Sequence, residues 1–238
     1  MALIEVVPLP GVRWCAWCRD AGRRTIAVAS LTDDHVPRPL GHPGEPMCAR
    51  HALARQSGAA SLPPVGPVVL VGPPAIGKTT VGRELGALLG QPCCDTDAAV
   101  EAEVNQTIPQ IFAESGEPAF RELEHRAAAS AIRNGGVVCL GGGAVTTPEV
   151  RDALRGLPVV WLALGVGQVP SHVGTGGRPL LDGDDPQAAW RRLAAEREPL
   201  YAAVSCLRVN RTGRQAREVA EAIAGALDWP VATKGEMS

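Results

Sequence analysis

The sequence predicts an α/β fold in which a five-stranded parallel sheet is covered by helices on both faces, preceded by a small N-terminal module. Three observations support this prediction. From residue 68 onwards, short apolar runs alternate with stretches of helical spacing. A glycine-rich phosphate-binding motif follows the first of these runs. The first 50 residues lack long periodic runs and hold three of the seven cysteines.

Size and composition set the first limits. The chain has 238 residues, enough for one α/β domain of ordinary size and an appendage. The formal net charge of −2 does not support bulk binding to nucleic acid. No segment approaches the ~20 apolar residues of a membrane span, and the first residues make a poor signal peptide. We therefore expect a cytoplasmic protein without membrane or nucleic-acid partners, and a monomer.

The domain boundary is predicted where the composition changes. Residues 56–67 are rich in Gly, Ser and Pro and are typical of a flexible linker. We therefore expect a module at 1–60 with a linker to about 67, an α/β domain at 68–229 and a disordered tail at 230–238.

The elements of the α/β domain follow from the hydrophobic pattern and its breaks. Strands are expected at 68–71, 92–95, 137–140, 159–164 and 206–209. Helices are expected at 79–89, 117–133, 148–155, 186–197 and 215–227, with a short additional helix capped by Thr107. Ligands of such a sheet bind beyond the carboxyl ends of its strands.

The most specific motif is G-P-P-A-I-G-K-T, a match to the phosphate-binding loop G-x-x-x-x-G-K-[ST] between a strand and a helix. Its glycines let backbone N–H groups surround phosphates, Lys78 supplies a point charge, and the Thr79 hydroxyl can ligate Mg²⁺. The chain has 21 Arg and only two Lys, so a lysine at 78 indicates that a compact ammonium is needed there. The predicted nucleotide-binding residues of this loop are Gly72, Pro73, Pro74, Ala75, Ile76, Gly77, Lys78, Thr79 and Thr80.

Two carboxylates, Asp95 and Asp97, stand at the predicted end of the second strand. One can serve a metal and the other can accept a proton from a substrate hydroxyl. The alternative is a pair of helix N-cap residues, because a helical stretch follows them.

Glycines and arginines mark two further places. Gly141, Gly142 and Gly143 follow the third strand and would let backbone amides approach a ligand closely. Arg178 ends a glycine-rich stretch and suits a lid that neutralises phosphate charge, although an ordinary surface loop would look the same. Arg121, taken alone, is a solvated helix residue.

In this order, the motifs resemble the shikimate kinase family over about two thirds of the chain, from Val68 to Leu227. They are the phosphate-binding loop (72–80), D-T-D (95–97), I-F-A-E (111–114), F-R-E-L-E (120–124), G-G-G-A-V (141–145), R-P-L-L (178–181) and R-E-P-L-Y (197–201). The resemblance implies ATP-dependent phosphorylation of shikimate to shikimate 3-phosphate with Mg²⁺, a step of aromatic amino acid biosynthesis.

The resemblance also implies roles for single residues. Catalysis would rest on Lys78, Asp97 as the candidate base and Arg178 on the lid. Mg²⁺ would be held by Thr79 and, through water, by Asp95. The residues implied to bind shikimate are Asp97, Arg121, Gly141, Gly142, Gly143 and Arg197, and those implied to bind ATP outside the phosphate-binding loop are Arg178 and Arg214.

Two departures from the family pattern stand out. The stretch V-P-S-H (169–172) lacks a second lid arginine, and Pro73-Pro74 should stiffen the phosphate-binding loop. Two other functions stay open: a kinase for a related polyhydroxy acid such as aminoshikimate, quinate or gluconate, and an adaptor that binds ligand without turnover.

The N-terminal module contains a C-x2-C and a C-x2-H pair. Cys15, Cys18, Cys48 and His51 would form a tetrahedral, structural zinc site of a zinc-ribbon-like module. The alternatives are free thiols in a disordered tail and a redox-active C-x-x-C motif. The module could dock a protein partner or have a purely structural role. The other cysteines, at 93, 94, 139 and 206, are expected to be buried, reduced thiols.

Overall fold

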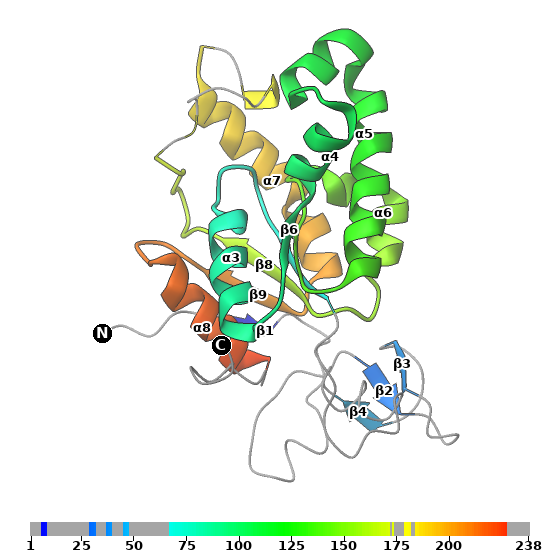
Figure 1. Ribbon diagram of the computed structural model, residues 1–238. Helices are drawn as coiled ribbons and strands as arrows, with labels where there is room; N and C mark the ends of the chain where they lie inside the picture. The colour runs from blue at the N-terminus through cyan, green and yellow to red at the C-terminus, as the bar shows by residue number, and fades with distance from the viewer. Residues whose placement is uncertain are drawn as a thin grey trace.

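The structure, a computed structural model, describes residues 67–171, 173, 179–181 and 184–227, together with the short strands 6–8, 29–31, 37–39 and 45–47. Its main sheet has six strands in the order β1-β9-β8-β5-β7-β6 (Figure 1). Five of them run parallel and confirm the predicted sheet. They are β5 (Val68–Val71), β6 (Cys93–Asp95), β7 (Val137–Cys139), β8 (Val159–Ala163) and β9 (Leu207–Asn210).

The sixth strand, β1 (Val6–Pro8), was not predicted. It pairs antiparallel with β9, with Val6 opposite Val209. A proline is tolerated there because β1 is an edge strand, where an absent N–H interrupts no ladder on the outer side. Part of the segment assigned to the N-terminal module therefore belongs to the main sheet.

A second, three-stranded antiparallel sheet has the order β3-β2-β4. Its strands are β2 (Ala29–Leu31), β3 (Pro37–Pro39) and β4 (Glu45–Met47). The residues outside the part that the structure describes include the four predicted zinc ligands, residues 56–66 of the linker and the C-terminal tail.

Helices cover both faces of the main sheet. They are α3 (Lys78–Leu89), α4 (Thr96–Val104), α5 (Ile108–Asn134), α6 (Pro148–Ala153), α7 (Pro186–Val204) and α8 (Ala216–Ala226), with single turns η1 (Ala144–Thr146) and η2 (Pro179–Leu181). Val68 and Leu70 of β5 pack in one core cluster with α3 and α8, which lie side by side in Figure 1. Val69 and Val71 pack in a second cluster with α5, α6 and α7. This alternation makes β5 a central strand buried on both faces.

Two predicted helices differ from those observed. The predicted helix 186–197 continues through Pro199 to Val204. A proline costs a backbone hydrogen bond, but the following turn buries Tyr201, which is 1% exposed, against the sheet. The short helix capped by Thr107 and the helix predicted at 117–133 form one element, α5, which is interrupted at Gly116 (φ 76°, ψ 173°). Thr107 caps it as predicted, through a capping box with Gln110.

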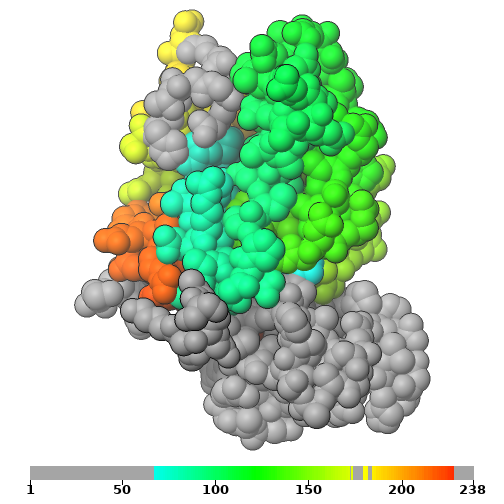
Figure 2. Space-filling view, in the orientation of Figure 1, coloured from blue at the N-terminus to red at the C-terminus, as the bar shows by residue number. Residues whose placement is uncertain are grey.

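Chain order places the functional end of the sheet. The chain leaves β5, crosses to β6, returns to β7 beside β5, and then passes to β8 on the other side of β5. The carboxyl end of β5 is therefore the switch point at which α/β sheets bind ligands. In the space-filling view, α3, α4 and α5 make up much of the visible face (Figure 2). None of the helices that the structure describes could span a membrane.

Candidate active site

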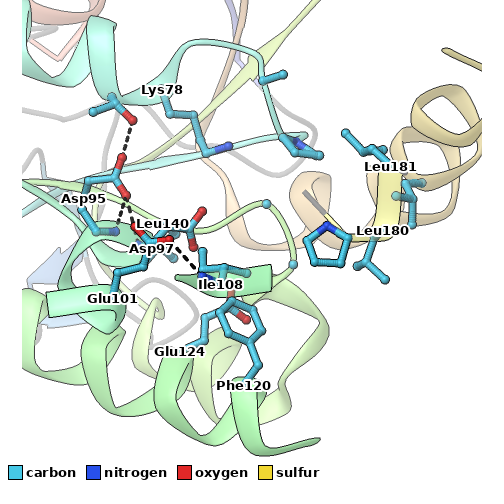
Figure 3. Close-up of a pocket in the computed structure, with 18 of the residues that line it drawn as sticks. Lys78, Asp95, Asp97, Glu101, Ile108, Phe120, Glu124, Leu140, Leu180 and Leu181 are labelled. Carbon is cyan, nitrogen blue, oxygen red and sulfur yellow. Dashed lines mark hydrogen bonds between the residues drawn. The ribbon is translucent and has the colours of Figure 1, made fainter. Parts of the chain in front are cut away.

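A cavity of about 490 Å³ opens beyond the carboxyl ends of β5, β6 and β7. It is lined by the phosphate-binding loop, by α4 and α5, by the triple-glycine segment, by η2 and by Arg197 of α7. Figure 3 shows Lys78, Asp95 and Asp97 among the residues around it. Residues that were predicted separately for phosphates, metal, proton transfer and substrate thus share one cavity. The members of these sets that line it are Pro74, Ala75, Gly77, Lys78, Thr79, Thr80, Asp95, Asp97, Arg121, Gly142, Gly143 and Arg197.

The phosphate-binding loop is built tightly around its lysine. Lys78 is 8% exposed, and its Nζ donates to the carbonyl oxygens of Gly72 and Pro73, both at 2.9 Å. Gly72 (φ 144°) is required because a Cβ there would meet the carbonyl oxygen of Leu162 at 2.5 Å. On the other side, Trp190 of α7 donates its Nε1–H to the carbonyl of Pro74 at 2.8 Å. The loop is therefore held in shape without a ligand.

The two carboxylate oxygens of Asp95 have different partners. Its Oδ1 caps α4 by accepting from the backbone N–H groups of Asp97 (3.0 Å) and Ala98 (3.3 Å). Its Oδ2 accepts a short hydrogen bond from the hydroxyl of Thr79. The cap fixes the Asp95 carboxylate beside Thr79, so two hard oxygen donors stand together next to the phosphate-binding loop. Such donors suit Mg²⁺.

Asp97 lies on the first turn of α4 and faces the cavity (Figure 3). Burial raises the pKa of Asp97 to about 7, and the charges of Glu124, Asp95 and Glu101 also raise it, while Lys78 lowers it. A carboxylate with a pKa near neutrality can take up and release a proton at physiological pH.

Each glycine of the triple-glycine segment leaves room for a different group. A Cβ on Gly141 would collide with the carboxylates of Asp97 and Glu124. A Cβ on Gly142 would meet Pro74 of the phosphate-binding loop at 2.8 Å, and one on Gly143 would collide with the guanidinium of Arg121. The backbone of this segment therefore packs against three groups: the carboxylates of Asp97 and Glu124, the phosphate-binding loop, and the guanidinium of Arg121.

Arg121 is held between two carboxylates. Its Nη1 pairs with Glu124 at 2.6 Å and its Nη2 with Glu117 at 2.7 Å. Arg121 is 16% exposed and Glu124 only 1%, so Arg121 is not the solvated residue that the sequence alone suggested. Burial raises the pKa of Glu124, and the positive charge of Arg121 opposes that rise. No role was predicted for Glu124 from the sequence, although its i,i+3 spacing from Arg121 indicates that the two side chains share one helix face.

The carbonyl oxygen of Gly142 accepts two hydrogen bonds, from Arg197 Nη1 at 3.1 Å and from the Tyr201 hydroxyl at 2.6 Å. Since a trans peptide directs its C=O and N–H to opposite sides, these bonds orient the N–H of Gly143 away from α7. Arg197 also lines the cavity and is 7% exposed. Tyr201, for which the sequence predicted no role of its own, does not line the cavity but helps to hold the Gly142 carbonyl in place.

Other predicted residues lie elsewhere. Arg178 is outside the described residues. Arg214 lies in the loop between β9 and α8 and does not line the cavity. Of the four cysteines expected to be buried, Cys139 and Cys206 are buried, whereas Cys93 and Cys94 are partly exposed because β6 is an edge strand. All four are free thiols.

Comparison with known proteins agrees with this geometry. A sequence model of the shikimate kinase family matches residues 74–228. The chain is 42% identical to the shikimate kinase of Rhodococcus jostii over 161 residues, 67% of this chain and 96% of that protein. It is 48% identical to the enzyme of Halorhodospira halophila over 164 residues, 67% of this chain and 92% of that protein.

Solved structures give the same result. The shikimate kinase from Acinetobacter baumannii in complex with shikimate superposes with a TM-score of 0.64 at 35% identity, covering 66% of this chain and 90% of that one. The shared sequence, the parallel sheet and the cavity around Lys78, Asp97 and Arg197 thus lead to one conclusion: the chain belongs to the shikimate kinase family.

Proposed function

We infer that this protein transfers the γ-phosphoryl group of ATP to a hydroxyl of shikimate, giving ADP and shikimate 3-phosphate. The observation that carries the inference is the shared cavity. A phosphate-binding loop, a carboxylate with a pKa near neutrality and two arginines line the same 490 Å³. The solved relative from Acinetobacter baumannii, 35% identical to this chain, is a complex with shikimate.

On the nucleotide side, the backbone N–H groups of residues 75–80 would surround the phosphates, with the dipole of α3 behind them. Lys78 would exchange its two carbonyl partners for the oxygens of the β- and γ-phosphates. Thr79 and Asp95 would hold Mg²⁺, which would neutralise the negative charge that develops on the phosphates. Arg178 and Arg214 would add positive charge around the nucleotide.

On the acceptor side, Arg121 and Arg197 would bind the carboxylate of shikimate, since guanidinium groups pair with carboxylates through two parallel hydrogen bonds. Gly143 would offer its outward-facing N–H to the ring substituents. Asp97 would accept the proton of the reacting hydroxyl as the phosphoryl group moves in line from ATP. Positioning and charge neutralisation provide most of the catalysis in such a transfer.

The product tests this proposal. Incubation with Mg-ATP and shikimate is expected to give a single new phosphomonoester signal in ³¹P NMR and the mass of a shikimate monophosphate. Asp97→Asn should abolish that signal while ADP binding persists. Nucleotide binding without any phosphorylated shikimate in the wild-type protein would contradict the proposal.

We further propose that the segment after β1, up to residue 60, forms a separate module in which Cys15, Cys18, Cys48 and His51 bind zinc. Their C-x2-C and C-x2-H spacing supports this, as does a short antiparallel sheet that ends at Met47, next to Cys48. Metal analysis of the purified full-length protein is expected to find about one zinc per chain, as one tetrahedral site requires. A Cys48→Ser variant should lose that zinc, and a zinc-free wild-type protein that keeps its fold would refute the site.

A further inference from the structure

An arginine outside the predicted set contacts the phosphate-binding loop. Arg211 follows β9, and its Nη1 donates to the carbonyl of Ile76 at 2.5 Å. The Arg211 guanidinium also lies against the backbone of Gly77, where a Cβ would collide with it. Gly77 is the residue before Lys78 and begins α3 as its N-cap. A second cation therefore lies against the part of the loop from which helix N–H groups face phosphates.

This cation has no anionic partner among the residues that the structure describes. The ion pairs there involve Arg121, Arg126, Arg155 and Arg217. Arg211 is half-buried, and burial lowers its pKa. A partly desolvated charge without a counter-ion is unfavourable in the empty protein, and an anionic ligand would relieve that cost.

The backbone around Arg211 is anchored in advance. The Arg211 N–H donates to the carbonyl of Ala163 at the end of β8 (3.0 Å), and the Thr212 hydroxyl accepts from the N–H of Gly165 (2.8 Å). The Thr212 N–H donates to Asn210 Oδ1 at 3.1 Å. The loop is thereby tied to the neighbouring strand, so little conformational entropy remains to be lost when the side chain binds a ligand.

We propose that Arg211 is a nucleotide-binding residue that pairs with the α- or β-phosphate of the nucleotide. Lys78 reaches the inner half of the loop, at Gly72 and Pro73, whereas Arg211 reaches its helix end at Ile76 and Gly77. The two cations thus lie at opposite ends of the phosphate-binding loop. The α- and β-phosphates are the ones cradled by the loop's backbone, while the lysine serves the β- and γ-phosphates. The proposal rests on the inferred use of ATP at this loop.

The test is the affinity for ADP of wild-type protein, Arg211→Gln and Arg211→Lys, measured by calorimetry on the full-length chain. Gln keeps a donor for the Ile76 carbonyl but lacks the charge. We expect Arg211→Gln to weaken ADP binding by about tenfold or more, as for a lost charge-assisted hydrogen bond, while shikimate affinity is unchanged. Arg211→Lys should recover a large part of the loss.

Arg217→Gln is the matched control, since Arg217 lies on nearby α8 and pairs with Glu84 and Glu221 on the surface. It removes the same charge and is expected to change ADP affinity less than about twofold, because exposed ion pairs contribute little energy. Less than a threefold loss in Arg211→Gln would overturn the proposal. So would an equal loss of shikimate affinity, or a lower unfolding temperature, because either would make Arg211 a clamp for the loop. A wild-type protein that does not bind ADP would instead refute the use of ATP.

Discussion

Replacing Asp97 by Asn should stabilise the ligand-free, metal-free protein at high pH while removing its turnover. Burial and neighbouring carboxylates raise the pKa of Asp97 from 3.8 to about 7. A raised pKa in the folded state means that folding binds a proton, so the wild-type protein loses stability as pH rises from about 4 to about 7. Asn carries no charge and escapes this loss.

The size of the effect follows from the shift. At 1.36 kcal/mol per pKa unit, the wild-type protein should lose about 3 kcal/mol relative to Asp97→Asn between pH 5 and pH 8. This figure is an upper limit, because the cavity leaves the side chain partly open to water. The assay is urea unfolding of both proteins at the two pH values, so that any pH-independent effect of Asn cancels in the double difference.

Asp152→Asn provides the control, because Asp152 is 65% exposed on α6 and pairs with Arg155 only on the surface. The difference in free energy of unfolding between wild-type protein and Asp152→Asn should change by less than about 0.5 kcal/mol from pH 5 to pH 8, as for ordinary surface substitutions. If the stability curves of the wild-type protein and Asp97→Asn run parallel across this range, Asp97 does not have a raised pKa. The proposed base would then lack its physical foundation.

Four further substitutions, one of them a matched control, test other residues in and around the site. Glu124→Gln removes the buried partner of Arg121 and should lower kcat/KM for shikimate about tenfold. Glu117→Gln removes the exposed partner and should change kcat/KM less than about twofold. Similar values of kcat/KM for the two variants would contradict the account. Tyr201→Phe deletes one of two donors to the Gly142 carbonyl and should raise KM for shikimate about fivefold, corresponding to about 1 kcal/mol, with KM for ATP unchanged. An effect on thermal stability alone would make Tyr201 structural. Gly141→Ala should reduce kcat about 100-fold or more in a folded protein, because the new Cβ would collide with the carboxylates of Asp97 and Glu124. Full activity of this variant would show that the glycine segment can shift to make room for the Cβ.

Local patterns predicted the features that depend on neighbouring residues. The phosphate-binding loop, the cap formed by Thr107 and the five parallel strands all follow from spacing within a few residues. The position of Asp95 could also be predicted, because a strand end and a helix start coincide there. A sequence does not show that the two oxygens of this carboxylate have different partners, one the cap of α4 and the other the Thr79 hydroxyl.

Contacts between distant residues were beyond such patterns. Tyr201 bonds to a carbonyl 59 positions away, and Trp190 to one 116 positions away. The continuation of α7 past Pro199 depends on the burial of Tyr201, which outweighs the local cost of proline. The edge strand β1 has three residues and two valines, too short a signal to separate it from the irregular N-terminal segment. Arg211 was one of 21 arginines, and only the fold places it against Gly77.

The most direct test of the central claim is ADP release by the purified protein with Mg-ATP, alone and with shikimate, quinate or gluconate. If the cavity holds ATP and shikimate together, shikimate alone should strongly stimulate ADP release, and the stimulation should saturate. Stimulation by quinate or gluconate instead would move the acceptor to another polyhydroxy acid. No stimulation by any of the three, with ADP still bound, would contradict the claim and leave a protein that binds nucleotide without phosphorylating these acids.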